Sequence, residues 1–513
     1  MARITMFLPG DYRPKPNELA EPNVRGFVRA LEKAVTHLGH QVRLIDRFLT
    51  TPADAIEALS GVDEPMIGVY AHWVYGPHTT DGVVGGDAPL LLASNFDGTW
   101  PGLVGLLNTG ACLTSLGRAH SRLWSDAADL TTDGEFMERL DAWVRGGAIE
   151  HDTGCLQTPP PPRESAVVDA VLDGMRRKRP LILMLGDTSM GMINGYFGPQ
   201  RLARVGFSEH KVDQAWLIEA VKQIPGERVD DALAFVRDRG VTFHYGGDFT
   251  EAATREQLGA YCAVLDFLAE FRADCLGWQY QLGLIRSLAP SDFAEGLLNS
   301  ACRPESNGST VACATEADQG NVLPMEMLKR LLLAHGLHES VAFHDVRWGG
   351  LHDGRFLWVL LNSGSAGAYA FNHDPDSLAG VHSYRQPPAY FPIPGGTFAG
   401  ESLAGGITWA RCWLDTEGLV MDVGRGEVVQ LPPAVRDVWW QSTTPEWPFM
   451  AADLGISRDD LMAHYQSNHV AVAYGDVFDD MVELSRRLGF RVRVMARGTG
   501  ASARAEGARP TRG

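Results

Sequence analysis

The first third of the chain alternates short apolar runs with longer stretches in which apolar residues recur every three to four positions. Ile4–Pro9 is typical of a buried strand, and Asn23–Leu38 of a helix that buries one face. The pattern then predicts strands at Gln41–Ile45 and Met66–Trp73 and helices at Pro101–Leu116 and Glu135–Val144. Strands that alternate with helices favour a parallel α/β layer.

The run of four prolines in Thr158–Pro162 interrupts this pattern, because such a segment is stiff and cannot continue a helix. We expect a linker there, after a first domain of residues 1–158. The alternation then restarts. It predicts strands at Pro180–Leu185, Leu276–Gln279 and Val341–Val346, and helices at Ser165–Met175, Val212–Gln223, Val229–Arg239, Glu256–Arg272 and Val322–Ala334.

The last third changes character, since short apolar runs now lie between Gly, Asp and Pro turns. Strands are predicted at Phe356–Asn362, Ala368–Phe371, Ile407–Leu414, Gly418–Val423, Glu427–Leu431 and Arg491–Met495, with one late helix at Asp479–Leu488. We therefore expect two Rossmann-like α/β domains, residues 1–158 and 163–345, and a β-rich, barrel-like domain, residues 346–496. The Gly-, Ala- and Arg-rich residues 497–513 are predicted to be a disordered tail.

The charge balance restricts the partners. The 513 residues include 45 Lys and Arg against 63 Asp and Glu, a net charge of −18, whereas nucleic acid and anionic membranes require a basic face. No apolar run approaches the ~18 residues of a membrane span, and the N-terminus lacks the features of a signal peptide. The seven cysteines are scattered, without a CxxC pair. We expect a cytoplasmic protein with neither a nucleic-acid nor a membrane partner.

Four polar segments carry groups that a scaffold does not need: Gly186–Met192, Ala314–Asp318, Phe343–Trp348 and Ser467–His469. Each also has an ordinary interpretation: a strand–helix turn, a helix cap by Asp318, an ion pair between Asp345 and Arg347, and a structural histidine. Together they supply two carboxylates and an imidazole, a mixed oxygen and nitrogen set that suits Mn²⁺ or a similar divalent ion.

Seven short segments stand in order along nearly the whole chain: Pro9–Arg13, Asn95–Gly102, Ser189–Gly191, Glu316–Asp318, Asp345–Arg347, Leu361–Gly364 and Asn468–His469. In this order they resemble the L-fucose isomerase family and, more distantly, L-arabinose isomerase. The resemblance implies the same architecture of two α/β domains and a β-rich domain. It also implies an intramolecular oxidoreductase that interconverts an aldose and a ketose.

The resemblance further implies that Glu316, Asp345 and His469 bind the metal. Glu316 and Asp345 would share the proton transfers through a cis-enediol, and which of them acts as base stays open. The remaining implied contacts are with the monosaccharide, from Arg13, Trp100, Met190, Gln279 or Gln281, Ser363 and Asn468. In a homo-oligomer with sites near subunit interfaces, Arg13 and Trp100 would reach the site of a neighbouring subunit.

One departure affects the substrate. Ser94 stands where the family has a Trp before its FNGT-like loop, so we expect a sugar other than L-fucose itself. Two alternatives remain: a non-catalytic sugar-binding or regulatory protein on the same scaffold, and a metal-assisted hydrolase or lyase of a sugar derivative.

Overall fold

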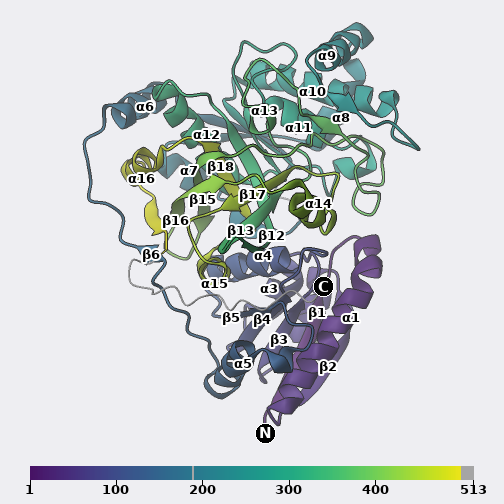
Figure 1. The fold of residues 1–513 in the computed structure, drawn as a ribbon, viewed down its shortest axis with the longest axis vertical. Coiled ribbons are helices and arrows are strands. Elements are labelled where there is room, and N and C mark those ends of the chain that lie inside the picture. Colours follow the sequence, from purple (N-terminus) through teal and green to yellow (C-terminus); the bar gives the residue numbers. More distant parts are fainter. Residues whose placement is uncertain (188–189, 498–513) are drawn as a thin grey trace.

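The computed structural model describes residues 1–187 and 190–497. Figure 1 shows a first α/β unit at the bottom, a second α/β unit at the top, and a strand-rich unit between them. The segment with the four prolines has no secondary structure and runs along one side from the first unit to the second. None of the helices among the described residues is both long and apolar enough to span a membrane.

The first unit is a parallel sheet with the strand order β2-β1-β3-β4-β5. This order occurs in doubly wound sheets of the flavodoxin type. Its strands are β1 (Arg3–Pro9), β2 (Gln41–Leu49), β3 (Met66–Tyr70), β4 (Leu90–Asn95) and β5 (Ser121–Ser125). The helices are α1 (Pro14–His37), α2 (Pro52–Leu59), α3 (Pro77–Val83), α4 (Gly102–Ser115) and α5 (Gly134–Gly146).

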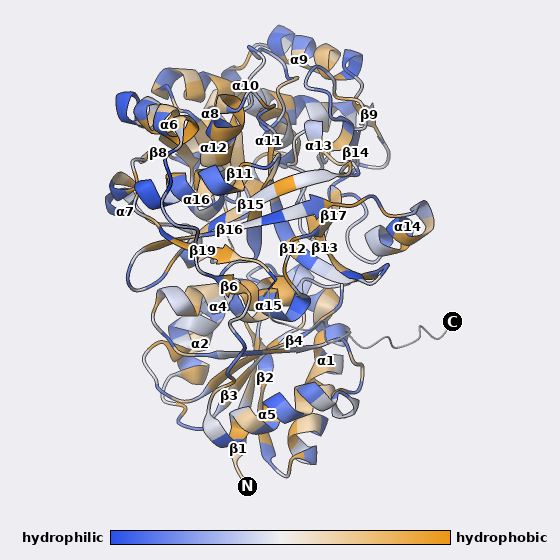
Figure 2. Cartoon of the chain, turned by 60° about the vertical axis from the view of Figure 1, so that its left-hand side comes forward, coloured by the Kyte–Doolittle hydropathy of each residue, from blue (hydrophilic) through white to orange (hydrophobic). Residues whose placement is uncertain are grey.

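The second unit repeats the same principle, with a parallel sheet of order β11-β10-β7-β8. Its strands are β7 (Leu181–Leu185), β8 (Ser208–Val212), β10 (Cys275–Trp278) and β11 (Ala312–Thr315). The helices are α6 (Ala166–Arg177), α7 (Pro199–Arg204), α8 (Gln214–Gln223), α9 (Gly226–Asp238), α10 (Glu251–Phe271), α11 (Asp292–Leu298) and α12 (Gln319–Ala334). In Figure 2 the outer helix α9 shows blue and orange side by side, as expected for a helix that buries one face.

The third unit is a closed ring of strands in the order β15-β18-β12-β13-β17-β16, in which β16 pairs again with β15. This is the barrel-like arrangement that the turn-rich last third predicts. Two further strands extend the sheet from β16: β19 and then β6. The strands are β6 (Leu156–Gln157), β12 (Val341–His352), β13 (Arg355–Leu361), β15 (Gly405–Leu414), β16 (Leu419–Val428), β17 (Phe449–Asp453), β18 (His469–Tyr474) and β19 (Arg491–Met495).

The remaining elements lie around this ring. The short strands β9 (Thr242–Phe243) and β14 (His382–Ser383) pair with each other, which joins the second unit to the third. The helices are α13 (Tyr369–Asn372), α14 (Pro433–Gln441), α15 (Arg458–His464) and α16 (Phe478–Arg487).

Several sequence expectations need correction. Ala368–Phe371 was expected as a strand, but this region forms the short helix α13. Gly418–Val423 and Glu427–Leu431 were expected as two strands, but the first and the start of the second form the single strand β16. β12 runs across the expected domain boundary at residue 345, so residues 341–345 pair within the barrel. The expected disordered tail lies, apart from Arg497, outside the described residues, as does Ser189.

Candidate active site

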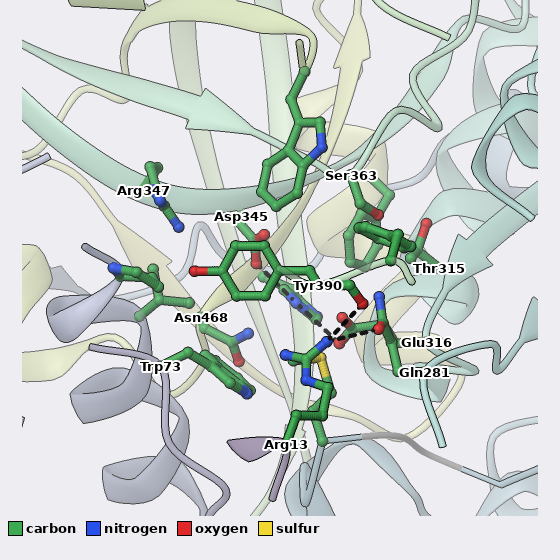
Figure 3. A pocket seen from close by; sticks show the side chains of 17 residues that line it. Arg13, Trp73, Gln281, Thr315, Glu316, Asp345, Arg347, Ser363, Tyr390 and Asn468 are labelled. Atoms are coloured by element: carbon green, nitrogen blue, oxygen red, sulfur yellow. Dashed lines mark hydrogen bonds and ion pairs between the residues drawn. The ribbon is translucent and has the colours of Figure 1, made fainter. Parts of the chain in front are cut away.

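A pocket lies where the carboxyl ends of strands from both parallel sheets meet the barrel. In parallel sheets of this kind, ligands bind at the carboxyl ends of two adjacent strands from which the chain continues towards opposite edges of the sheet. Here these strand pairs are β1 and β3 in the first unit and β7 and β10 in the second. Arg13 and Trp73 follow β1 and β3, and Met190 and Gln281 follow β7 and β10. Thr315 and Glu316 come from the end of β11, and the barrel adds Phe343, Asp345, Arg347, Ser363, Asn468 and His469. Figure 3 shows these side chains converging.

The two acids and the histidine singled out in the sequence come together in this pocket. Asp345 on β12 and His469 at the start of β18 are directly paired in the antiparallel ladder. The Nε2 atom of His469 lies 2.9 Å from Oδ1 of Asp345 and 3.8 Å from Oε2 of Glu316. β-Sheet register thus brings together two residues that are far apart in the sequence.

Glu316 is held in a strained backbone. Its φ is +64° and that of Ala317 is +55°, two consecutive non-glycine residues in the left-handed region. Such conformations cost of order 1–3 kcal/mol each and cluster at functional sites. The turn directs the carboxylate into the pocket, where Oε2 is buried without a hydrogen-bond partner. Strain and an unsatisfied carboxylate oxygen at the same residue point to a ligand rather than to packing.

Asp318 orients the histidine. Its Oδ1 accepts a hydrogen bond of 2.8 Å from the backbone N–H of Gly320, so it caps α12 as the sequence predicts. Its Oδ2 lies 2.7 Å from Nδ1 of His469 and is also paired with Arg411. Burial raises the pKa of Asp318, but Arg411 and His469 outweigh this effect and hold it at about 2. This second role was missed; the short spacing from Glu316 is the signal that could have revealed it.

The electrostatics of the cluster favour a shared proton when no cation is bound. Burial raises the pKa of Glu316 to about 8, an effect that His469 opposes and the neighbouring carboxylates reinforce. Burial lowers the pKa of His469, but Asp345 and Asp318 outweigh it and raise the value to about 9. Among the described residues no group of three or more His, Cys, Asp or Glu side chains is arranged so that it could hold a metal ion, so Glu316, Asp345 and His469 would have to move closer together to do so.

Arg13 lines the pocket of its own chain, and its expected contribution to a neighbouring subunit's site stays a prediction. Its guanidinium pairs with buried Asp11 through Nε–Oδ1 at 3.0 Å and a second nitrogen to Oδ2 at 2.7 Å. It also donates to Oε1 of Gln281 at 2.9 Å (Figure 3) and lies over the Tyr390 ring, 5.2 Å from its centroid. Of the two glutamines proposed, Gln281 lines the pocket, and Gln279 is hydrogen-bonded to Gln214 instead.

Of the other predicted substrate contacts, some line the pocket and some do not. Met190, Ser363 and Asn468 line the pocket, and Oδ1 of Asn468 is buried without a partner. Trp100 does not line it and packs against the core of the first unit. Its contribution to a neighbouring subunit stays a prediction. Ser94 is buried on β4 and is also outside the pocket lining.

Sequence reasoning missed much of the pocket wall. Trp73 lies three residues after the end of β3, a position at which the strand order could have suggested a ligand contact. Tyr390, Phe391 and Trp447 come from loops, and nothing in their local sequence marks them. Arg347 was considered only as a partner of Asp345, but among the described residues it makes no hydrogen bond or ion pair, and its Nε is buried and unsatisfied. In the view of Figure 3 it lies on the other side of the Tyr390 ring from Glu316.

Comparison with known proteins adds two informative matches. Residues 360–496 match the family described as "L-fucose isomerase, C-terminal domain". A protein named L-fucose isomerase from Vibrio vulnificus (strain YJ016) is 28% identical over 253 residues, which is 41% of this chain and 42% of the relative. The chain thus covers well under two thirds of that relative's length.

Two solved structures give weaker matches. A LacI family transcriptional regulator from Arthrobacter sp. FB24 in complex with lactose has 16% identity and a TM-score of 0.14, and covers 62% of this chain and 99% of that one. A conserved domain protein from Vibrio cholerae has 10% identity and a TM-score of 0.17, covering 62% and 90%. These scores carry no argument about the fold. The chain thus resembles L-fucose isomerases in two ways: residues 360–496 match that family's C-terminal domain, and about two fifths of the chain is similar to the Vibrio vulnificus relative.

Proposed function

We propose that this protein is a metal-dependent aldose–ketose isomerase that acts on a free monosaccharide of the fucose or arabinose type. The observation that carries the proposal is the convergence of Glu316, Asp345 and His469 in one pocket. Polar groups that can bind hydroxyls surround this cluster, from Arg13, Gln281, Ser363 and Asn468. Aromatic side chains and a few convergent polar groups are typical of a small-molecule site.

The donor set fits a divalent cation. Oε2 of Glu316 is buried without a hydrogen-bond partner, and two carboxylates with one imidazole suit Mn²⁺ or a similar ion. Asp318 holds Nδ1 of His469, which leaves Nε2 facing the two acids. We therefore propose Glu316, Asp345 and His469 as the metal ligands. A bound cation would supply Lewis-acid polarisation of the sugar carbonyl and acidify the neighbouring C–H bond.

The two acids supply the proton transfers. One carboxylate removes the proton from C2 of the open-chain aldose, and the electron pair left behind forms the C1–C2 double bond of a cis-enediol. Return of that proton to C1, with a proton moved between O1 and O2 by the other acid, gives the ketose. Because close carboxylates titrate together, a base and an acid are not assigned separately to Glu316 and Asp345.

The remaining residues position the sugar. Arg13 is fixed by Asp11 and shares a hydrogen bond with Gln281, so the two can present a rigid pair of polar groups to the substrate hydroxyls. Asn468 has an unsatisfied Oδ1 and adds an acceptor beside His469. Trp73, Tyr390 and Trp447 provide the apolar walls that exclude water from the enediol.

The decisive experiment assays a panel of free aldoses with the metal-depleted protein, with and without added Mn²⁺, and follows ketose formation and C2 proton exchange in D₂O. We expect Mn²⁺-dependent isomerisation of at least one sugar and solvent deuterium incorporation. Glu316→Gln should abolish both, whereas Glu57→Gln, at an exposed position on α2, should leave them unchanged.

Other outcomes would favour the alternatives. Tight binding of a sugar without turnover would support a sugar-binding protein. Bond cleavage without isomerisation would support a hydrolase or lyase. Turnover that survives in Glu316→Gln would contradict the proposed chemistry.

A further inference from the structure

A second cavity lies between the first α/β unit and the barrel, away from the candidate active site. It occupies about 400 Å³ and is lined by the connection from α4 to β5, the segment after α5, and the end of α15. Its lining includes two arginines, Arg118 and Arg122, and two histidines, His120 and His151, and no Asp or Glu is among the lining residues. Such a concentration of basic groups is unusual in a chain with a net charge of −18.

The two arginines are buried without a counter-ion. Arg122 is 3% exposed and Arg118 is 8% exposed, and neither forms an ion pair among the described residues. Arg122 donates to the carbonyl oxygens of Met462 and Tyr465 and to Oε1 of Gln466. Arg118 donates to the carbonyl oxygens of Val83, Ala119 and Ala88.

Each guanidinium therefore uses three of the five N–H groups that an arginine carries, and two remain. Neutral carbonyl partners satisfy part of the hydrogen bonding but supply no negative charge. A buried charge without a partner is costly, so the cavity is prepared for an anion.

The neighbouring histidines are neutral at pH 7, so the positive charge beside the cavity comes from the two arginines. Burial, Arg122 and Arg118 lower the pKa of His120 to about 3, and burial and Arg139 lower that of His151 to about 4. Nε2 of His151 is buried without a partner. The nearby acids among the described residues form no ion pair with Arg118 or Arg122. Glu135 pairs with Arg139, and Asp422 pairs with Arg493. Burial lowers the pKa of Arg118, and Asp87 opposes this effect only through its charge.

We propose that this cavity binds a small molecule that carries a phosphate group. The planar fork of arginine matches phosphate oxygens, and both arginines are among the residues that line the cavity. The volume exceeds that of a bare phosphate ion and leaves room for a small organic moiety, such as a sugar.

Binding there has a direct route to the active site. Oε1 of Gln466 accepts hydrogen bonds from Arg122 and from Thr114, and Gln466 lies three residues before His469. A phosphate that draws Arg122 away from Gln466 alters the support of the segment that carries Asn468 and His469. This regulatory part of the inference rests on the proposed isomerase function, whereas the binding itself does not.

Calorimetric titration of the full-length, metal-depleted protein at constant ionic strength tests the binding. The probes are inorganic phosphate, glucose 6-phosphate and glucose. We expect glucose 6-phosphate to bind in the sub-millimolar range, and Arg118→Gln to weaken it at least tenfold. Arg122→Lys, which keeps the charge but loses the fork, should weaken it less. Arg355→Gln, at an exposed position paired with Glu427, should have no effect.

The titrations distinguish a phosphorylated small molecule from the free phosphate ion, and a second variant covers the case in which the first does not fold. Equal affinity for inorganic phosphate would support the site and assign it to the free ion. If Arg118→Gln does not fold, His151→Ala should weaken binding several-fold. Absence of binding at 10 mM, or binding unchanged in both variants, would overturn the inference. A change in isomerase rate upon phosphate binding is measured separately, so its absence would contradict only the regulatory part.

Discussion

The imidazole of His469 is held between two carboxylates, with Nδ1 2.7 Å from Oδ2 of Asp318 and Nε2 2.9 Å from Oδ1 of Asp345. Asp318 is completely buried and belongs to the second unit, whereas Asp345 and His469 are neighbours in the barrel. The hydrogen bond to Nδ1 therefore joins the two units at the candidate metal site and defines which nitrogen faces the pocket.

Replacing Asp318 with Asn should weaken Mn²⁺ binding by about 10–100-fold, because an oriented and basic His469 needs its carboxylate partner. The measurement is a Mn²⁺ titration followed by calorimetry. Asp318→Asn also leaves the buried Arg411 without its ion-pair partner, which should destabilise the protein. The double variant Asp318→Asn/Arg411→Met removes this unpaired charge, so it should restore stability but not metal affinity. Unchanged affinity in both variants would contradict the role given to Asp318; Asp353→Asn, at an exposed position, is the control.

Replacing Asp11 with Asn should raise KM for the sugar about tenfold and change kcat less. Asp11 fixes Arg13 through two parallel hydrogen bonds, and without them the guanidinium no longer meets Gln281 in one defined position. Steady-state kinetics with the best substrate of the panel check this. An equal loss in kcat with no change in KM would indicate that the pair acts on the chemical step instead.

Replacing Arg347 with Met should stabilise the protein by about 1 kcal/mol or more and weaken substrate binding. The guanidinium is 5% exposed, and burial lowers its pKa, but no described residue pairs with it. Urea unfolding and KM are measured together. Arg493→Met is the comparison variant. It leaves the buried Asp422 without its ion-pair partner and should therefore destabilise the protein. A destabilised Arg347→Met variant with normal KM would show that Arg347 is a packing residue.

Stability should fall as the pH rises from about 4.5 towards neutrality because of Asp292 and Glu295 on α11. Both are buried without a cation partner among the described residues, and burial raises both pKa values well above the ordinary values of 3.8 and 4.5. In this window the folded state binds protons that the unfolded state has lost. Each group therefore costs about 1.4 kcal/mol per pH unit until it ionises in the folded state.

The check is urea unfolding between pH 5 and 8 for the wild type and for Asp292→Asn/Glu295→Gln, which keeps the shapes but removes the titration. The variant should have a clearly smaller slope than the wild type, because the contributions of Asp292 and Glu295 are removed while that of Glu316 remains. An unchanged slope in the double variant would assign the pH dependence to other groups.

Local patterns sufficed for most of the elements. The spacing of apolar residues located strands such as β1, β7 and β10 and helices such as α10 and α12. An element that buries one face needs apolar residues at its own repeat, which is two residues in a strand and 3.6 in a helix. The predicted elements were wrong where an apolar run is too short to show a repeat. Around Ala368–Phe371 a short apolar run fits a strand and a helix turn equally well, and tertiary packing decides for α13.

For the candidate site, the sequence by itself supplied the donor types: two carboxylates and an imidazole in Glu316, Asp345 and His469, with Met190, Ser363, Asn468 and either Gln279 or Gln281 expected around them. Tertiary structure alone decided that Arg13 lines the pocket of this chain, that Gln281 rather than Gln279 lines it, and that Asp318 is hydrogen-bonded to His469. The reason is physical. Residue type and spacing carry the donor chemistry and local periodicity, whereas strand order, cross-strand register and backbone strain exist only once the units have packed together.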